Sequence, residues 1–265
     1  MNEFDYIQTL TQLSDTELEE LALEPAEVQV IVGEFYVALD ERSEMTNTQL
    51  ASMGYTPEEI ELLQKYAAGE ELSVSEYRAI ARTCTGDIIK GTTGTKMFTF
   101  SYIWEWDHQP LIYLTDSAAM AWQAIDPQGY AVDAPMKSYT SVINYCSGTA
   151  VLATKTGERE ANLDFNGINI SFPVTQFMIY GGMEVTTYAK SGRIEVSISL
   201  AAGIDNTISY IKVAGLYAHT TVGVGAPSMG LSSGGIDISF SGNIGIDKIA
   251  GKKKQITASG IETEI

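Results

Sequence analysis

Hydrophobic residues recur along this chain with two different periods, and the change of period falls near residue 86. Before it, apolar residues return every three or four positions, which is the spacing of one helix face. After it, short runs alternate apolar and polar residues, which is the spacing of a strand, and turn-forming residues separate the runs. The pattern predicts an α+β protein in two segregated halves: a small all-α helical module over residues 1–86 and an antiparallel β-sandwich domain over residues 87–265.

The helical module is predicted from repeated helix-start signals. Thr46 with Gln49 forms a capping box, in which two side chains satisfy free N–H groups of the first helical turn. Residues 13–28 align with residues 45–60 at an offset of 32 residues, so we expect an internal repeat of two units, each a short helix followed by a longer one. Two units are few for a free-standing array. We therefore expect the module to cap the β domain, and a separate protein-interaction module is the alternative.

The β half is expected to be organised around the stretch from Met97 to Trp106. Successive side chains of a strand point to opposite faces, so aromatic residues at alternate positions share one face. Five aromatic residues occupy such positions here: Phe98, Phe100, Tyr102, Trp104 and Trp106. We expect this strand to open the β half and to form the nucleus of its core.

Turn signals predict where several later strands begin and end. Asn166-Gly167 is typical of a two-residue type I′ hairpin turn, because both central positions of that turn need positive φ. The segment 190–193, Lys-Ser-Gly-Arg, is expected to separate one strand ending at Ala189 from another beginning at Ile194. The lack of helical periods between these strands argues against a parallel α/β fold.

The densest group of polar and aromatic residues lies at the end of the aromatic strand. Glu105 and Asp107 share one strand face, so their carboxylates can converge on one ligand beside stacking tryptophans, as in a carbohydrate-binding cleft. The alternative, commoner among proteins, is that the tryptophans are core residues and that Asp107 and His108 belong to a turn. The candidate ligand-binding residues are Trp104, Glu105, Trp106, Asp107, His108 and Asp116.

The chain is acidic, and this changes the expected partners. Its formal net charge is −18, from 34 acidic and 16 basic residues, so it repels nucleic acid, and we expect no nucleic-acid partner. The basic run Lys252 to Lys254 is more typical of a solvated loop. The start of the chain lacks the features of a signal peptide. Many Ser, Thr, Gly and Tyr residues with few Lys nevertheless favour an exported bacterial protein, extracellular or at the cell surface, with a cytoplasmic location as the alternative.

Cysteine and histidine are too sparse for most metal sites. Cys84 and Cys146 are candidates for a single disulfide bridge between the end of the helical module and the β half, and two free thiols are the alternative. His108 and His219 are the two histidines, and neither has a zinc-like pairing nearby. No phosphate-binding or dinucleotide-binding motif is present, so we expect no metal and no cofactor.

These observations favour a non-catalytic, exported or cell-surface protein that binds a glycan or a protein ligand. A pore-forming or membrane-active β protein is one alternative, because residues 181–201 alternate polar and apolar side chains, and membrane contact would follow from it. A hydrolase that uses Glu105, Asp107 or Asp116 is another. The sequence leaves the ligand and the oligomeric state open.

Overall fold

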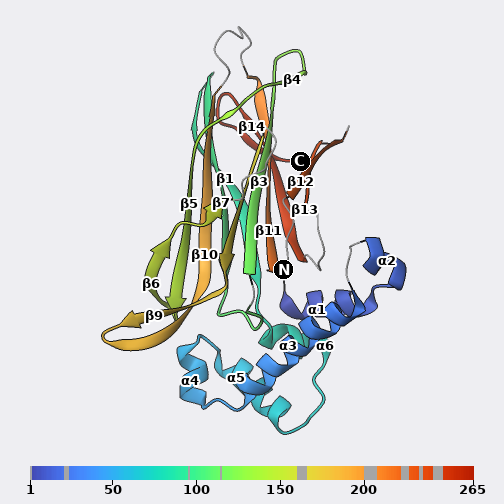
Figure 1. Ribbon diagram of the computed structural model, residues 1–265, viewed down its shortest axis with the longest axis vertical. Coiled ribbons are helices and arrows are strands. Elements are labelled where there is room, and N and C mark those ends of the chain that lie inside the picture. Colours follow the sequence, from blue (N-terminus) through green and yellow to red (C-terminus); the bar gives the residue numbers. More distant parts are fainter. Residues whose placement is uncertain are drawn as a thin grey trace.

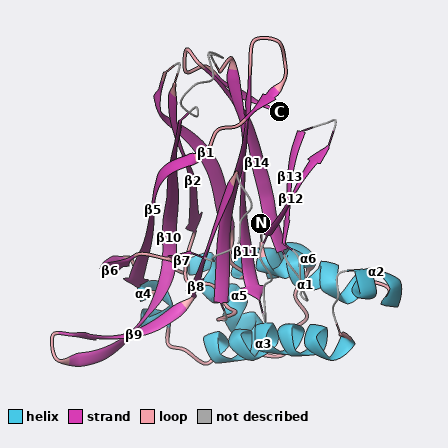
Figure 2. Cartoon of the chain, turned by 45° about the horizontal axis from the view of Figure 1, so that its top comes forward, coloured by secondary structure: helices cyan, strands magenta, loops and turns pink. Residues whose placement is uncertain are grey.

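The computed structural model describes residues 2–20, 24–94, 96–113, 115–159, 166–199, 208–221, 227–232, 235–240 and 247–265. Helices come first and strands follow, so the α+β architecture in segregated halves is confirmed (Figures 1 and 2). The helices lie at one end of the strands. They are α1 (Glu3–Gln12), α2 (Asp15–Glu20), α3 (Pro25–Ser43), α4 (Asn47–Ser52), α5 (Pro57–Ala67) and α6 (Val74–Ile80).

The helix starts follow the capping signals of the sequence. Thr46 and Gln49 form the capping box of α4, and Thr56 and Glu59 form that of α5, where Pro57 takes the first helical position. The division into two repeat units stays a prediction. Every helix in the described part of the chain is too short or too polar to cross a membrane.

The strands form two antiparallel sheets that face each other as a sandwich (Figure 1). The first sheet contains, in spatial order, β1 (Cys84–Thr93), β2 (Met97–Trp106), β10 (Met183–Ser199), β5 (Met136–Ser147) and β6 (Ala150–Lys155), with β9 (Thr175–Tyr180) paired to the beginning of β10. The second contains β15 (Glu262–Glu264), β14 (Asp247–Thr257), β11 (Tyr210–Thr221), β3 (Thr115–Ile125), β8 (Gly167–Pro173) and β7 (Glu158–Arg159), with β4 (Ala131–Val132) paired to β3. A separate pair is formed by β12 (Pro227–Ser232) and β13 (Gly235–Phe240).

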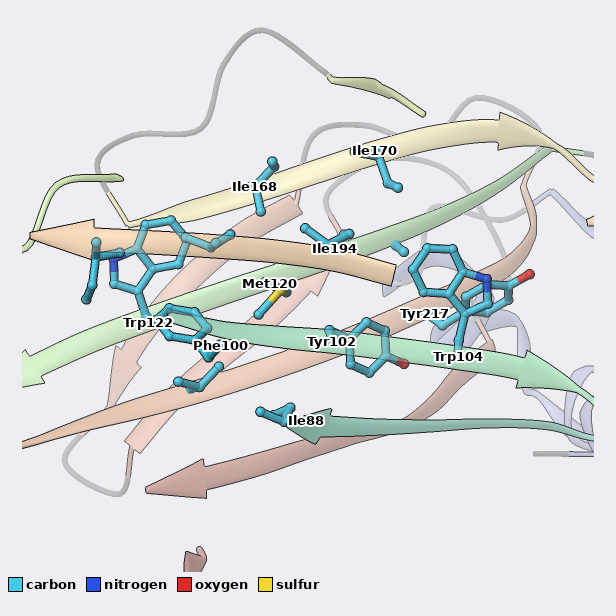
Figure 3. Close-up of a cluster of buried hydrophobic side chains, with 14 of the residues drawn as sticks. Ile88, Phe100, Tyr102, Trp104, Met120, Trp122, Ile168, Ile170, Ile194 and Tyr217 are labelled. Carbon is cyan, nitrogen blue, oxygen red and sulfur yellow. The ribbon is translucent and has the colours of Figure 1, made fainter. Parts of the chain in front are cut away.

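The aromatic row of β2 is the centre of the sandwich core, as predicted, but β2 does not open the β half, because β1 precedes it and pairs with it. All five aromatic side chains of β2 are buried, and Trp104 stacks on Phe172 of the opposite sheet with ring centroids 5.5 Å apart. Figure 3 shows Phe100, Tyr102 and Trp104 of this row together with Tyr217 of the other sheet. Glycines make room for these rings. Gly192 of β10 pairs with Trp104, and a Cβ at Gly192 would lie 2.0 Å from Cζ2 of that tryptophan. The row therefore depends on the neighbouring strand having no side chain at that point.

The helices have a hydrophobic core of their own, to which the β half contributes. Leu111 and Ile112, from the connection between β2 and β3, are buried in the cluster formed by residues such as Phe4, Phe35 and Leu63. The helical module thus packs around a loop of the β half and caps that end of the sandwich.

Three turn or loop predictions differ from the structure. The segment 190–193 lies inside β10, which runs unbroken through it with a bulge between Ala189 and Ser191. Gly167 begins β8 and has no positive φ, so Asn166-Gly167 is not a type I′ turn; the expected partner strand, residues 161–165, lies outside the described residues. The run Lys252 to Lys254 belongs to β14, and Lys254 pairs with Asp87 at 3.0 Å.

Substituting Gly192 tests the packing of the aromatic row. We expect Gly192→Ala to lower the free energy of unfolding by about 1–3 kcal/mol, because the added methyl group must displace the ring of Trp104. Gly33→Ala in α3 is the matched control: nothing lies within 4 Å of that position, so alanine should stabilise the helix by about 0.5–1 kcal/mol. Urea unfolding measures both, and equal stability of the two variants would contradict the packing argument.

Candidate functional site

The two tryptophans proposed for a binding cleft are core residues. Trp104 is 2% exposed and Trp106 is fully buried, and Nε1 of Trp106 donates a hydrogen bond of 2.9 Å to the hydroxyl of Tyr217. The prediction of an exposed aromatic cleft is therefore wrong for these two residues. The physical reason is that their strand face points between the two sheets, where burial of large aromatic side chains is most favourable.

Asp107 and His108 lie side by side near the junction with the helices, and Nδ1 of His108 is 3.8 Å from a carboxylate oxygen of Asp107. Glu105 is exposed on the outer face of β2. The carboxylate of Asp107 also accepts hydrogen bonds from the backbone N–H groups of Thr83 (3.0 Å) and His108 (2.7 Å). The ring of His108 lies against Gly54, and its burial, together with the smaller effect of the positive charge of Arg82, lowers the pKa of His108. The role of these three side chains in ligand binding stays a prediction.

Asp116 instead belongs to a buried cluster of ionisable groups. One of its oxygens lies 2.9 Å from Nδ1 of His219, and the other accepts a hydrogen bond from the hydroxyl of Tyr217. On the opposite side of the ring, Nε2 of His219 lies 3.4 Å from a carboxylate oxygen of Glu3. Asp116, His219 and Glu3 are all fully buried. A histidine from β11 is thus held between a carboxylate of β3 and a carboxylate of α1.

Glu3 is fixed by the backbone of both halves. Its carboxylate accepts hydrogen bonds from the N–H groups of Leu111 (2.8 Å), Ile112 (3.1 Å) and Arg82 (3.2 Å). These donors come from the connection after β2 and from the end of the helical module. Hydrogen bonds to a charged acceptor are stronger than those between neutral groups. The position of α1 is therefore tied to the β half through one buried side chain.

The cluster holds His219 in its charged form. Burial by itself lowers the pKa of His219, but the charges of Asp116 and Glu3 and their hydrogen bonds outweigh this effect and raise the pKa to about 10. A protonated ring has no free lone pair and cannot accept a proton as a base. Asp116 and Glu3 are also closed to solvent. The geometry therefore fits a buried ion-pair cluster that holds the helices to the sandwich better than a reaction centre.

The candidate disulfide does not form, because the sheet order separates the two cysteines. Cys84 and Cys146 are both free and buried. Cys84 begins β1 and Cys146 lies in β5, and β2 and β10 run between these strands. At about 4.8 Å per strand the gap is roughly 14 Å, whereas a disulfide needs Cα atoms within about 7 Å of each other.

The most exposed apolar group of the described structure is a two-stranded projection, and its second strand lies within residues 181–201, the segment whose alternation predicted membrane contact as an alternative. We call it the β9–β10 ribbon: residues 175–180 of β9 paired with residues 183–188 of β10. Gly181 and Gly182 join the strands with φ values of 59° and 81°, the positive values that a tight hairpin turn needs. The exposed fractions of its apolar residues are 82% for Ile179, 74% for Phe177, 68% for Met183 and 61% for Tyr180.

Both faces of the ribbon are apolar near its tip. Directly paired residues of an antiparallel ladder point to the same face, so Tyr180 with Met183 and Met178 with Val185 form one face. Phe177 and Ile179 lie on the other, opposite Thr186 and Glu184. The carboxylate of Glu184 is the one charge among residues 175–188. A charge-poor surface of this kind is suited to contact with another apolar surface.

The ribbon also has an unprotected edge. Among the described strands β9 pairs with β10 alone, and its register contains no bulge. β9 carries neither proline nor a charged residue, the features that usually block pairing at the edge of a sheet. In Figures 1 and 2 the ribbon reaches sideways past the rest of the molecule, so a partner can approach its tip.

Comparisons with known proteins add little to this geometry. No family model matches the sequence, and no curated protein matches it. Among solved structures, the chain is similar to AvmM, described as catalysing macrocyclization in alchivemycin A biosynthesis, with 10% sequence identity over 51% of this chain and 72% of that one. The TM-score is 0.23, which is too low to support an argument about fold or activity.

The buried cluster predicts a specific pH dependence of stability. The pKa of His219 is about 10 in the folded protein and about 6.5 in the unfolded chain. The contribution of protonated His219 to the free energy of unfolding is therefore complete below pH 6.5 and is lost as the pH rises through about 10. His219→Gln should lower the free energy of unfolding at pH 7 by about 3–5 kcal/mol, because two buried carboxylates lose their cation.

Urea unfolding at several pH values between 7 and 10 gives the free energy of unfolding of the wild type and of His219→Gln. Lys and Tyr residues titrate alike in both proteins, so their effect cancels in the difference between the two free energies. The difference should shrink toward pH 10. His108→Gln, at the other histidine, is the control and should keep the wild-type slope. A difference between wild type and His219→Gln that stays constant over this range would contradict a charged His219.

Proposed function

We propose that this protein is a non-catalytic binding protein whose contact element is the β9–β10 ribbon. The exposure of the ribbon carries the proposal. Among the described residues, three of the four most exposed large hydrophobic side chains are Ile179, Phe177 and Met183, all within the ribbon. Single exposed apolar residues are common on protein surfaces, whereas a contiguous group on a projecting element is typical of a contact site.

The state of the ionisable groups supports binding over catalysis. The hydrolase alternative relies on Asp116, but that carboxylate is buried against His219 and Tyr217. Glu105 and Asp107, its other candidates, lie outside this cluster, and the Asp107 carboxylate is engaged by two backbone N–H groups. General acid–base catalysis needs a group that can reach the proton of a bound substrate.

The burial of the tryptophans also changes the favoured ligand. Stacking on a sugar ring needs an exposed aromatic face, and Trp104 and Trp106 have none. A partner with an apolar surface therefore fits better than a glycan. The proposed location is extracellular or at the cell surface, on the grounds of composition, with the helical repeat acting as a cap on the β domain.

Photo-crosslinking in cells of the source organism tests the proposal. A benzophenone amino acid at position 177 should give an adduct with a lipid or a protein, because Phe177 is 74% exposed within the ribbon. The same amino acid at position 130 is the control, since Tyr130 is 71% exposed but lies outside the ribbon. Excess unlabelled wild-type protein should suppress the adduct, and excess Phe177→Asp should not. Equal adduct yields at positions 177 and 130, or no adduct at position 177, would contradict the proposed function.

A further inference from the structure

We infer that the partner of the β9–β10 ribbon is the surface of a zwitterionic lipid bilayer, into which the tip of the ribbon inserts to a shallow depth. This inference rests on the proposed function and names its partner. It is carried by the distribution of apolar side chains on the ribbon, by the length of the ribbon and by the position of charge along it.

The ribbon carries apolar side chains on both faces, with Glu184 as its one charged residue. A flat protein surface covers one face of a two-stranded ribbon and leaves the other in water. Docking of the Tyr180 and Met183 face would therefore leave Phe177 and Ile179, on the opposite face, exposed. A bilayer surrounds an inserted tip and removes both faces from water at once. The free energy gained grows with the apolar area buried, so the medium that covers both faces is favoured.

The length of the ribbon also fits a shallow insertion. Its outer four residue pairs run from Tyr180 with Met183 to Phe177 with Thr186. At about 3.3 Å per residue the three steps between these pairs extend roughly 10 Å, which matches the 5–10 Å to which interfacial segments enter a membrane. The whole ribbon has six residues in each strand, about 20 Å. A membrane-spanning strand needs about 9–11 residues, so this conformation inserts without spanning.

The polar groups of the ribbon also suit this depth. The open edge of β9 keeps backbone groups that need hydrogen bonds, and the hydrated headgroup region can supply them whereas the hydrocarbon core cannot. Tyr180 stands beside the turn, and tyrosine is enriched where a membrane meets water because its ring is apolar and its hydroxyl is polar. Both features fit a shallow position.

Charged groups near the ribbon favour zwitterionic lipids. Lys155, at the end of β6, donates a hydrogen bond to the side chain of Gln176 at the root of the ribbon. With the outer residues inserted, Lys155 lies at the level of the lipid phosphates. The net charge of −18, however, repels a surface of anionic lipids. Zwitterionic lipids present phosphates to Lys155 without a net negative surface, so they suit both features.

Flotation of the full chain with phosphatidylcholine vesicles tests the inference. Wild-type protein should float with the vesicles, and Ile179→Asp should reduce the bound fraction about tenfold or more, because a carboxylate replaces a buried aliphatic side chain. Ile179 is 82% exposed, so this change should leave the fold intact, as circular dichroism and urea unfolding can verify. Tyr130→Asp is the matched control: that residue is 71% exposed outside the ribbon and should bind vesicles like the wild type.

Two further measurements distinguish insertion of the ribbon from non-specific adsorption to vesicles. Glu184→Gln removes the one charge of the ribbon and should strengthen vesicle binding several-fold, since no carboxylate has to leave water. Phosphatidylglycerol added to the vesicles should weaken binding at low salt. Stronger binding to anionic vesicles, or equal losses for Ile179→Asp and Tyr130→Asp, would overturn the inference.

Failure of this inference differs from failure of the proposed function. Folded protein that stays off the vesicles but forms a competable protein adduct from position 177 would keep the binding function and reject the lipid partner. Self-association of wild-type protein in sedimentation equilibrium, lost in Ile179→Asp, would identify a second copy of the chain as the partner and would also reject the lipid.

Discussion

A continuous chain of hydrogen bonds and ion pairs joins the core of the sandwich to the first helix, and the arrangement of the two halves depends on it. It begins at Trp106 in the aromatic row, passes through Tyr217 to Asp116, and continues through His219 to Glu3. Each member is buried, so each polar group relies on its neighbour to replace the water that it lost. Breaking the contact of His219 with Asp116 or Glu3 would leave buried charge uncompensated. This explains why groups that resemble catalytic residues serve to position α1.

The β9–β10 ribbon differs from this buried network because its large apolar side chains are exposed to solvent. Most large apolar residues of the other described strands point into the space between the two sheets, whereas the ribbon extends past that space and no described element covers it. Its exposed Phe177 and Ile179 gain nothing from the fold. The proposed contact with a partner outside the chain would remove these side chains from water. The buried cluster, by contrast, has all of its charged groups enclosed by the fold.

Local signals were informative where a single segment decides its own conformation. The capping residue Thr46 begins a helix where expected, because a cap is satisfied within four residues of chain. Signals that depend on a partner strand were less reliable. The glycine of the segment 190–193 suggested a turn, yet Gly192 lies in mid-strand because the ring of Trp104 fills its place. The tight turn with positive φ occurs instead at Gly181-Gly182.

The sequence by itself determined the order of the two halves, the helix starts and the aromatic face of β2, since periodicity and capping act over short distances. The tertiary structure alone decided which apolar strands are covered. Alternation is the same for a buried strand and for the ribbon, and only the position of the second sheet separates Trp104 from Ile179. The tertiary structure also brings Glu3, Asp116 and His219 into contact. Residues so distant along the chain become neighbours only when the strand order and the docking of α1 are set.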